Sequence, residues 1–201
     1  EADSQYADVM ERALYNTVLG GMALDGKHFF YVNPLEVHPK SLKFNHIYDH
    51  VKPVRQRWFG CACCPPNIAR VLTSIGHYIY TPRQDALYIN MYVGNSMEVP
   101  IADGSLKLRI SGDYPWHEQV KIAIESPQSV YHTLALRLPD WCSAPQVLLN
   151  GQPVEQDIRK GYLHISRIWQ EGDTLSLTLP MPVRRVYGNP LVRHVAGKVA
   201  I

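Results

Sequence analysis

The sequence predicts an α+β chain, with helices and loops in residues 1–82 and an antiparallel β-sandwich in residues 83–201. Three observations lead to this prediction. Apolar residues recur at helical spacing near the start and the end of the first part, and the spacing changes to alternation from about residue 86. Turn-forming pairs then separate the alternating runs. The change of period places the boundary near residue 83.

The first predicted helix covers residues 4–19. Asp3 or Ser4 can cap its start, and the glycine pair at positions 20 and 21 is expected to end it. One buried face should be formed by the apolar residues that follow the i, i+3, i+4 spacing, which are Tyr6, Val9, Met10, Ala13, Leu14 and Val18.

A second helix is predicted to begin at the proline pair 65–66, because proline suits the first turn of a helix. Between the two helices, "HFFYVNP" (28–34) reads as a short extended segment, and residues 35–57 show no clear period. The apolar face of the second helix would carry Ile68, Val71, Leu72 and Ile75.

The second part of the chain consists of short runs in which apolar and polar residues alternate. Seven or more strands at this spacing favour a β-sandwich. Asn150-Gly151 is the sharpest hairpin signal, because both residues tolerate the positive φ angles of a two-residue turn. The runs are "ALYINMYV", "SLKLRI", "QVKIAIES", "YHTLALRL", "QVLLNG", "GYLHISR" and "DTLSLTLP".

Composition and charge exclude several classes of protein. The 201 residues are 46% hydrophobic and carry a net charge of +2, without a cluster of lysines and arginines, so we expect no nucleic-acid partner. No run approaches the ~18 apolar residues of a membrane span, so we expect no membrane partner. The chain lacks an initiator Met and ends within the apolar run "HVAGKVAI". We therefore expect it to be a piece of a longer protein, cut inside the sandwich.

Three of the four cysteines lie within four positions, in the stretch "WFGCACCPPNIAR" (58–70). They are too close for ordinary mutual disulfides, which need Cα atoms about 4.4–6.8 Å apart in a fixed orientation. The three cysteines could therefore be reduced thiols, contain a strained vicinal disulfide or bind a metal. A reducing compartment fits these readings best, so we expect a cytoplasmic protein.

An isolated cysteine would most simply be a small buried side chain, but three together suggest chemistry. Adjacent thiolates repel one another unless a cation neutralises them, and Zn²⁺ is soft enough for sulfur and inert to redox change. No second Cys-x-x-Cys or His-x-His pair occurs, so a zinc site would be incomplete in this chain. A redox pair of Cys61 and Cys64 lacks the surrounding βαβ pattern.

"WFGCACCPPNIARVLTSIGHYIY" closely resembles the signature of glycoside hydrolase family 127, the β-L-arabinofuranosidases. "YADVMERALYNTVLGGMALDGKHFFYVNPLE" resembles the segment before that signature, and "LPDWC", "VLLNG" and "LTLPMPVRRV" resemble the β-domain after it. The resemblance implies an (α/α)6-barrel catalytic domain followed by β-sandwiches. Residues 1–82 would then hold the last barrel helices and residues 83–201 one sandwich.

The resemblance also implies a retaining glycosidase that releases β-L-arabinofuranose. Cys63 would be the nucleophile, and Cys63 and Cys64 would bind Zn²⁺. The other zinc ligands and an acid/base glutamate would precede this chain, so the chain alone should be inactive. Glu11 and Tyr31 match sugar-binding positions. Without the resemblance, Glu11 would more simply lie on the solvent-exposed side of its helix. Tyr31 would be as well suited to packing in the core as to binding a sugar.

Two functions from other classes stay open at this point. One is a non-catalytic carbohydrate-binding module built on the sandwich, and the other is a small structural zinc domain. The expected partner is a small carbohydrate. The sequence leaves open whether the protein forms a homodimer.

Overall fold

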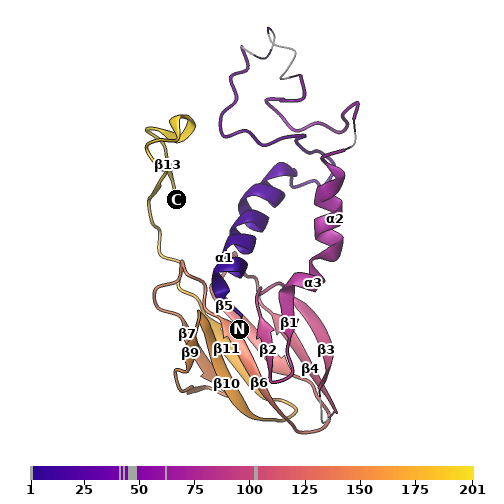
Figure 1. Cartoon of the computed structure of the whole chain (residues 1–201), viewed down its shortest axis with the longest axis vertical. Coiled ribbons are helices and arrows are strands. Elements are labelled where there is room, and N and C mark those ends of the chain that lie inside the picture. Colours follow the sequence, from indigo (N-terminus) through magenta and orange to yellow (C-terminus); the bar gives the residue numbers. More distant parts are fainter. Residues whose placement is uncertain (1, 41, 43, 45–48, 62, 102–103) are drawn as a thin grey trace. The chain divides into compact units, whose positions relative to one another are not determined.

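The computed structural model describes residues 2–40, 42, 44, 49–61, 63–101 and 104–201. Ala62 of the cysteine stretch lies outside the described residues. The chain divides into two compact units (Figure 1). The strand unit holds the residues up to Val9 together with Ile75–Met181, and the cysteine unit holds Met10–Ser74 and Pro182–Ile201. In the described part of the chain, no helix combines the length and the apolar character that crossing a membrane requires.

The first helical segment ends where its glycine pair predicts. It starts as α1 (Ser4–Arg12), continues as the π-helical η1 (Ala13–Val18) and closes with the 3₁₀ turn η2 (Leu19–Gly21). The Gln5 backbone N–H donates to Asp3 Oδ1 at 3.1 Å, so Asp3 acts as the predicted cap.

The buried side of α1 is mostly polar, which the spacing of the apolar residues did not predict. Ala7 is its only apolar residue among the described positions 4–12. Tyr6 and Val9 are 75% and 65% exposed, whereas Asp8 and Glu11 are only 4% and 3% exposed. The prediction of a buried apolar stripe is therefore wrong for Tyr6, Val9 and Ala13, which are exposed. The reason is that Asp8 pairs with the buried Arg137 of the strand unit, which turns the carboxylate side of the helix inward.

The second predicted helix begins at Pro66, as expected. It comprises α2 (Pro66–Ser74), followed by the short α3 (Gly76–Ile79). Its predicted apolar residues are only half-buried, and none of the residues of α2 is fully buried. Near the end of the chain, η5 (Arg193–Val195) is a single 3₁₀ turn.

The strands form three sheets. Five strands form one sheet in the order β1-β2-β6-β10-β9, six form another in the order β3-β4-β5-β11-β7-β8, and β12 pairs with β13 in the cysteine unit. The strands are β1 (Tyr80–Pro82), β2 (Ala86–Ile89), β3 (Asn95–Ile101), β4 (Gly104–Ser111), β5 (Gln119–Ile124), β6 (Val130–Arg137), β7 (Gln146–Leu149), β8 (Gln152–Pro153), β9 (Ile158–Arg159), β10 (Tyr162–Trp169), β11 (Thr174–Thr178), β12 (Val186–Tyr187) and β13 (Val199–Ala200).

One pairing corrects the expectation of purely antiparallel strands. β2 and β6 are parallel, with Ala86 opposite Thr133 and Ile89 opposite Leu136. Parallel neighbours need a long crossover connection, and here β3, β4 and β5 of the six-stranded sheet supply it. The other pairs among the described strands are antiparallel.

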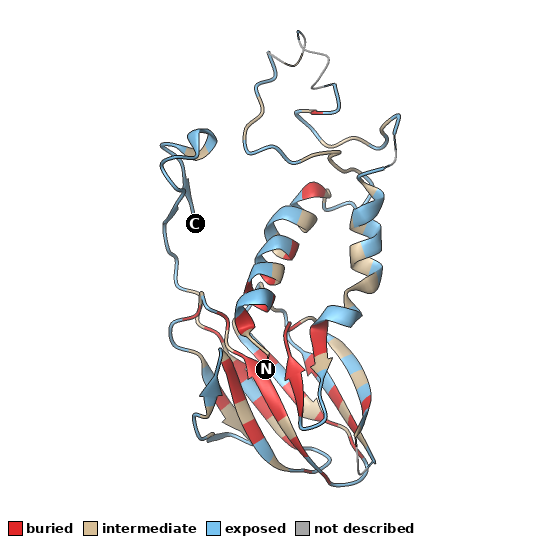
Figure 2. Cartoon of the chain, in the orientation of Figure 1, coloured by how far each residue is buried: buried red, intermediate tan, exposed pale blue. Residues whose placement is uncertain are grey.

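The core of the strand unit follows from the alternation. In β4, Leu106, Leu108 and Ile110 are buried while the residues between them are not, and the same pattern recurs in β5 and β11 (Figure 2). Asn150 and Gly151 have φ angles of 50° and 80° and join β7 to β8, which confirms the predicted hairpin.

Candidate functional site

The three clustered thiols and one phenol meet at a single point of the cysteine unit. Cys63 Sγ lies 3.4 Å from Cys61 Sγ and 3.5 Å from Cys64 Sγ. The hydroxyl oxygen of Tyr31 lies 2.6 Å from Cys63 Sγ. All three thiols are exposed and free of disulfides, whereas Cys142 is buried elsewhere. Cys63 is therefore the centre of the group, and we call these four residues the cysteine cluster.

A backbone bridge holds Tyr31 in reach of the cysteines. Phe29 and Gln56 exchange two N–H···O hydrogen bonds of 2.9 Å, which ties the extended segment 28–34 to the chain that leads into the cysteines. The Phe59 ring then packs against both neighbours, with centroids 5.7 Å from Phe29 and 5.4 Å from Tyr31. The ring contacts and the bridge together fix the direction of the phenol.

Arg55 connects the chain that leads into the cysteines to the end of the first helical segment. Its Nη2 donates to the Gly20 carbonyl oxygen at 2.6 Å, and its guanidinium lies 4.8 Å from the centre of the Phe30 ring. A cation suits this position, because the carbonyl groups at the C-terminal end of a helix carry partial negative charge.

Asn67, in the first turn of α2, holds the backbone of the two adjacent cysteines. Its Nδ2 donates to the carbonyl oxygens of Cys63 and Cys64 at 3.3 and 3.2 Å. Arg70 donates in turn to Asn67 Oδ1 at 3.2 and 2.9 Å, which orients the amide. Sequence reasoning did not single out these two residues, although both lie within the quoted cysteine stretch.

The start of α2 offers the sulfurs fewer backbone donors than a helix start normally would. Pro65 and Pro66 have no N–H group. The N–H groups of Asn67 and Ile68 already donate to the carbonyl oxygens of Cys64 and Pro65, both at 3.0 Å. The side-chain groups next to Cys63 Sγ are instead the Tyr31 hydroxyl at 2.6 Å and Cys61 Sγ, which donates to it at 3.4 Å.

Either Tyr31 Oη or Cys63 Sγ can donate in their 2.6 Å contact. The pKa of Tyr31 is raised well above its usual range, first by its hydrogen bond to Cys63 and then by those to Cys64 and Cys61. The phenol therefore keeps its proton at neutral pH and can give a hydrogen bond to sulfur. A thiolate at Cys63 would accept that bond.

The donor chemistry of the cluster suits zinc. Two sulfurs bound to one tetrahedral Zn²⁺ at about 2.3 Å lie about 3.8 Å apart, close to the 3.4 and 3.5 Å found here. The described residues contain no group of three or more His, Cys, Asp or Glu arranged to hold a metal ion. The described residues therefore fit part of a zinc ligand set and not a complete coordination shell.

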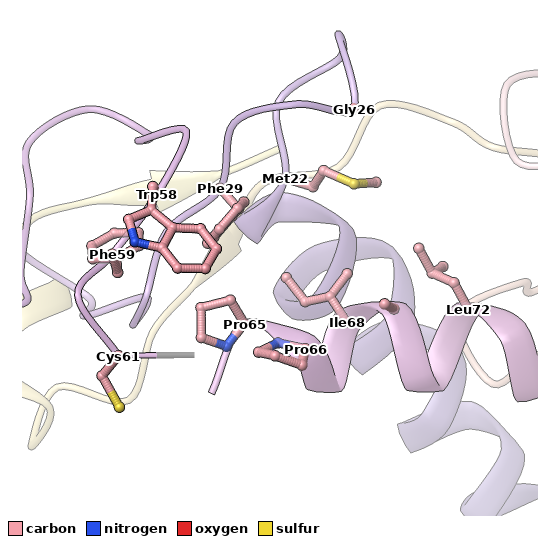
Figure 3. Close-up of a pocket in the computed structure, with 11 residues that line it drawn as sticks. Met22, Gly26, Phe29, Trp58, Phe59, Cys61, Pro65, Pro66, Ile68 and Leu72 are labelled. Carbon is pink, nitrogen blue, oxygen red and sulfur yellow. The ribbon is translucent and has the colours of Figure 1, made fainter. Parts of the chain in front are cut away.

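Two hollows border the cysteine cluster, and both include Cys61 in their lining. One, of about 500 Å³, is polar in part and is lined by Tyr31, Asp49, His50 and Gln56 among others. The other, of about 420 Å³, is apolar (Figure 3). Figure 3 shows the rings of Phe29, Trp58 and Phe59 on one side of it and α2 on another. The α2 residues that line it are Pro66, Ile68, Ala69 and Leu72.

His50 is a site residue that sequence reasoning missed. Its ring centre lies 5.5 Å from that of Tyr31, edge to face. It lies in the stretch 35–57, where no periodicity or motif marked any residue, so the sequence offered no basis for predicting a role for His50.

Glu11 is buried, so the reading of a solvated helix side is wrong. A carboxylate removed from water needs partners, and Glu11 has them. Its proposed role as a sugar ligand stays a prediction, as do the roles assigned to Tyr31, Cys63 and Cys64.

Comparison with known families covers both units. Residues 1–77 match the model of the β-L-arabinofuranosidase GH127 catalytic domain, and residues 86–181 match that of the GH127 middle domain. The chain belongs to glycoside hydrolase family 127.

Relatives of this family 127 chain include a curated protein and several solved structures. It is 37% identical over 209 residues to the non-reducing end β-L-arabinofuranosidase of Bifidobacterium longum subsp. longum, covering 100% of this chain and 31% of that protein. It is 51% identical to the GH127 β-L-arabinofuranosidase of Geobacillus stearothermophilus T6, whose crystal structure superposes with a TM-score of 0.88 over 100% of this chain and 32% of that one.

Another solved structure, described as a GH127 β-arabinofuranosidase, is 35% identical and has a TM-score of 0.84 over 98% of the family 127 chain and 32% of its own. The chain thus spans about a third of the length of the relatives it matches. The β-rich fold with few helices is that of family 127.

Proposed function

We propose that the protein carrying this chain is a retaining β-L-arabinofuranosidase whose nucleophile is the thiolate of Cys63. The observation that carries the proposal is the 2.6 Å contact between Tyr31 Oη and Cys63 Sγ, at the centre of the cysteine cluster and beside a partly polar hollow. Membership of family 127 and the names of the relatives support the same activity.

The proposed reaction has two displacements. In the first, the Cys63 thiolate attacks the anomeric carbon, a C–S bond forms, and the bond to the leaving oxygen breaks as a general acid protonates that oxygen. In the second, water attacks the same carbon from the other side, loses its proton to the resulting base, and the sulfur leaves as thiolate. Two inversions at one carbon retain its configuration. The resemblance assigns the acid/base role to a glutamate outside this chain.

Residues of this chain prepare Cys63 for that role. The neutral phenol of Tyr31 donates to the sulfur and stabilises its negative charge, both before attack and when the sulfur leaves. Asn67, oriented by Arg70, holds the backbone on which both adjacent thiols sit. When bound between Cys63 and Cys64, Zn²⁺ would supply the positive charge that keeps adjacent thiolates together.

The architecture around the site is part of the same proposal. The helices of this chain would complete an (α/α)6 barrel, and the five- and six-stranded sheets would form the β-sandwich that follows it. Glu11 and Tyr31 would contact the hydroxyl groups of a small carbohydrate. A reducing, cytoplasmic setting is proposed because a free thiolate must not be oxidised.

The test uses the full-length protein and an aryl β-L-arabinofuranoside. We expect Cys63→Ala to abolish turnover and to prevent a covalent pentosyl adduct on the peptide that contains residue 63. Cys142→Ala, a matched cysteine outside the cluster, should leave both intact. Activity that survives Cys63→Ala would overturn the nucleophile. Activity unchanged in every cysteine variant would instead favour a non-catalytic carbohydrate-binding role.

A further inference from the structure

A second hollow, of about 430 Å³, lies in the strand unit and shares no residue with the cysteine cluster. We propose that this hollow binds a neutral saccharide unit. The inference rests on the strand unit alone and does not depend on the catalytic role of Cys63. The residues that line it are Ala2, Arg83, Asp85, Ala86, Tyr88, Thr133, Arg159, His164 and Ser166.

The strand register explains why the sheet is hollow here. Opposed residues lie on the same face, so Ala86, Thr133 and Ser166 form one row across β2, β6 and β10. The next row, two residues along each strand, consists of Tyr88, Ala135 and His164. An alanine in each row leaves space between larger neighbours.

The floor of the hollow is rigid. Tyr88 packs edge to face against Tyr162, with ring centres 5.0 Å apart, and against His164 at 5.7 Å. Thr133 Oγ1 and Ser166 Oγ are hydrogen-bonded at 2.8 Å, which orders two hydroxyls side by side. A rigid site binds its ligand with little loss of side-chain entropy.

The charges around the rim are balanced. Arg159 is held by Asp157 through hydrogen bonds of 2.9 and 2.7 Å. Arg83 and Asp85 flank the turn between β1 and β2, which the hydrogen bond from Arg83 N to Ala86 O closes at 2.8 Å. Two arginines and two aspartates lie on or next to the rim, so their formal charges cancel and give the hollow little net charge with which to attract an anion.

A saccharide matches this mixture of groups. Its hydroxyls both donate and accept, so they can pair with guanidinium donors, a carboxylate acceptor and the Thr133–Ser166 hydroxyl pair at once. An apolar ligand would cover these polar groups without pairing their remaining donors and acceptors. The volume lies within the range of about 300–1,000 Å³ that is usual for small-molecule sites.

The test is isothermal titration of the full-length protein with L-arabinose and with xylobiose at millimolar concentrations. We expect at least one of these sugars to bind, and Ser166→Trp, which fills the hollow from an exposed strand position, to weaken that binding at least tenfold. Ser176→Trp is the matched control, because Ser176 is an exposed serine on β11 of the other sheet, and it should bind as the wild type does.

A second variant guards against misfolding of the first. Thr133→Val with Ser166→Ala keeps the shape of the strand but removes both hydroxyls, and it should also weaken binding. Three outcomes would overturn the proposal: neither sugar binds, the two hollow variants bind as tightly as the wild type, or inorganic phosphate displaces the sugar from the wild type.

Discussion

Asp8 and Arg137 form an ion pair in the interior of the strand unit. Asp8 Oδ1 lies 2.6 Å from Arg137 Nη1, and Arg137 is completely buried. The guanidinium also donates through Nε to the Asn90 carbonyl oxygen, and the Tyr92 hydroxyl donates to the Arg137 carbonyl. A buried arginine tolerates its charge only when it is paired and hydrogen-bonded in this way.

Asp8→Ala should therefore destabilise the chain strongly, because it leaves the Arg137 guanidinium buried without its counter-charge. We expect the free energy of unfolding to fall by about 3–5 kcal/mol. Urea denaturation followed by tryptophan fluorescence measures it. Glu125→Gln breaks the exposed ion pair with Arg109 and should cost less than about 1 kcal/mol. Equal losses in the two variants would contradict the interpretation.

Tyr31→Phe should slow the glycosidase reaction without unfolding the site. It removes a hydrogen bond to a charged sulfur, worth about 1.5–3 kcal/mol, so kcat/KM should fall by about 10- to 100-fold. The measurement is the kinetics of the full-length protein on an aryl β-L-arabinofuranoside. Tyr187→Phe, at an exposed tyrosine, is the control. An unchanged kcat/KM in Tyr31→Phe would remove Tyr31 from the mechanism.

Asn67→Ala should loosen the hold on zinc. The amide fixes the backbone of Cys63 and Cys64, and loss of a group that orients metal ligands typically costs about 10- to 100-fold in affinity. Competition with a chromophoric chelator on the full-length protein reports the change. Asn189→Ala, at an exposed turn, should have no effect. If both variants bind zinc with the affinity of the wild type, the hydrogen bonds of Asn67 do not contribute to zinc binding.

The 201-residue chain alone should not hydrolyse aryl β-L-arabinofuranosides, even with added zinc and reductant. Breaking the glycosidic bond requires a proton on the leaving oxygen, and such general-acid help is typically worth ~10²–10⁴-fold. The assay compares the chain with its Cys63→Ala variant. If the chain hydrolyses the substrate and Cys63→Ala abolishes this activity, the general acid lies within these residues.

Alkaline pH should weaken the strand unit. Burial raises the pKa of Tyr162 to about 12, above the usual value of about 10. The folded state thus retains a proton that the unfolded state loses, so stability is complete below about pH 10 and declines as the pH rises toward 12. Urea midpoints across this range measure the decline.

Tyr162→Phe supplies the control for that decline. It should make the decline between pH 10 and 12 shallower, since Tyr162 no longer titrates, but should not abolish it, because burial also raises the pKa of Tyr80 to about 12. At neutral pH it should cost about 1–3 kcal/mol, because Asn90 Oδ1 loses the Tyr162 hydroxyl that donates to it at 2.8 Å. A decline as steep as that of the wild type would show that other groups cause it.

Local features of the fold were predictable from sequence where local physics decides them. The hairpin at Asn150-Gly151 depends on two residues that accept positive φ, and the start of α2 depends on a proline. The buried side of α1 was not predictable, because it depends on Arg137, which lies far along the chain. The parallel pairing of β2 with β6 is equally non-local.

The candidate site divides in the same way. The three cysteines and their place before a helix are visible in a single stretch, and the family resemblance singled out Tyr31. No periodicity could show that Tyr31 touches Cys63, since Phe29 and Gln56 bring the two segments together. His50 comes from a stretch without a pattern, and only the folded chain places it beside Tyr31.

The parallel pairing of β2 with β6 also constrains the order of folding. Ala86 cannot meet Thr133 until the intervening chain is closed into a loop, and closing a loop costs entropy that grows with its length. Once β3, β4 and β5 have paired with their sequence neighbours, that loop is already compact and its ends are closer together. We therefore expect the β3–β5 meander to form in the folding transition state and the β2–β6 contact to form after it. Substitutions in β4 should then slow folding, and substitutions in β2 should mainly speed unfolding.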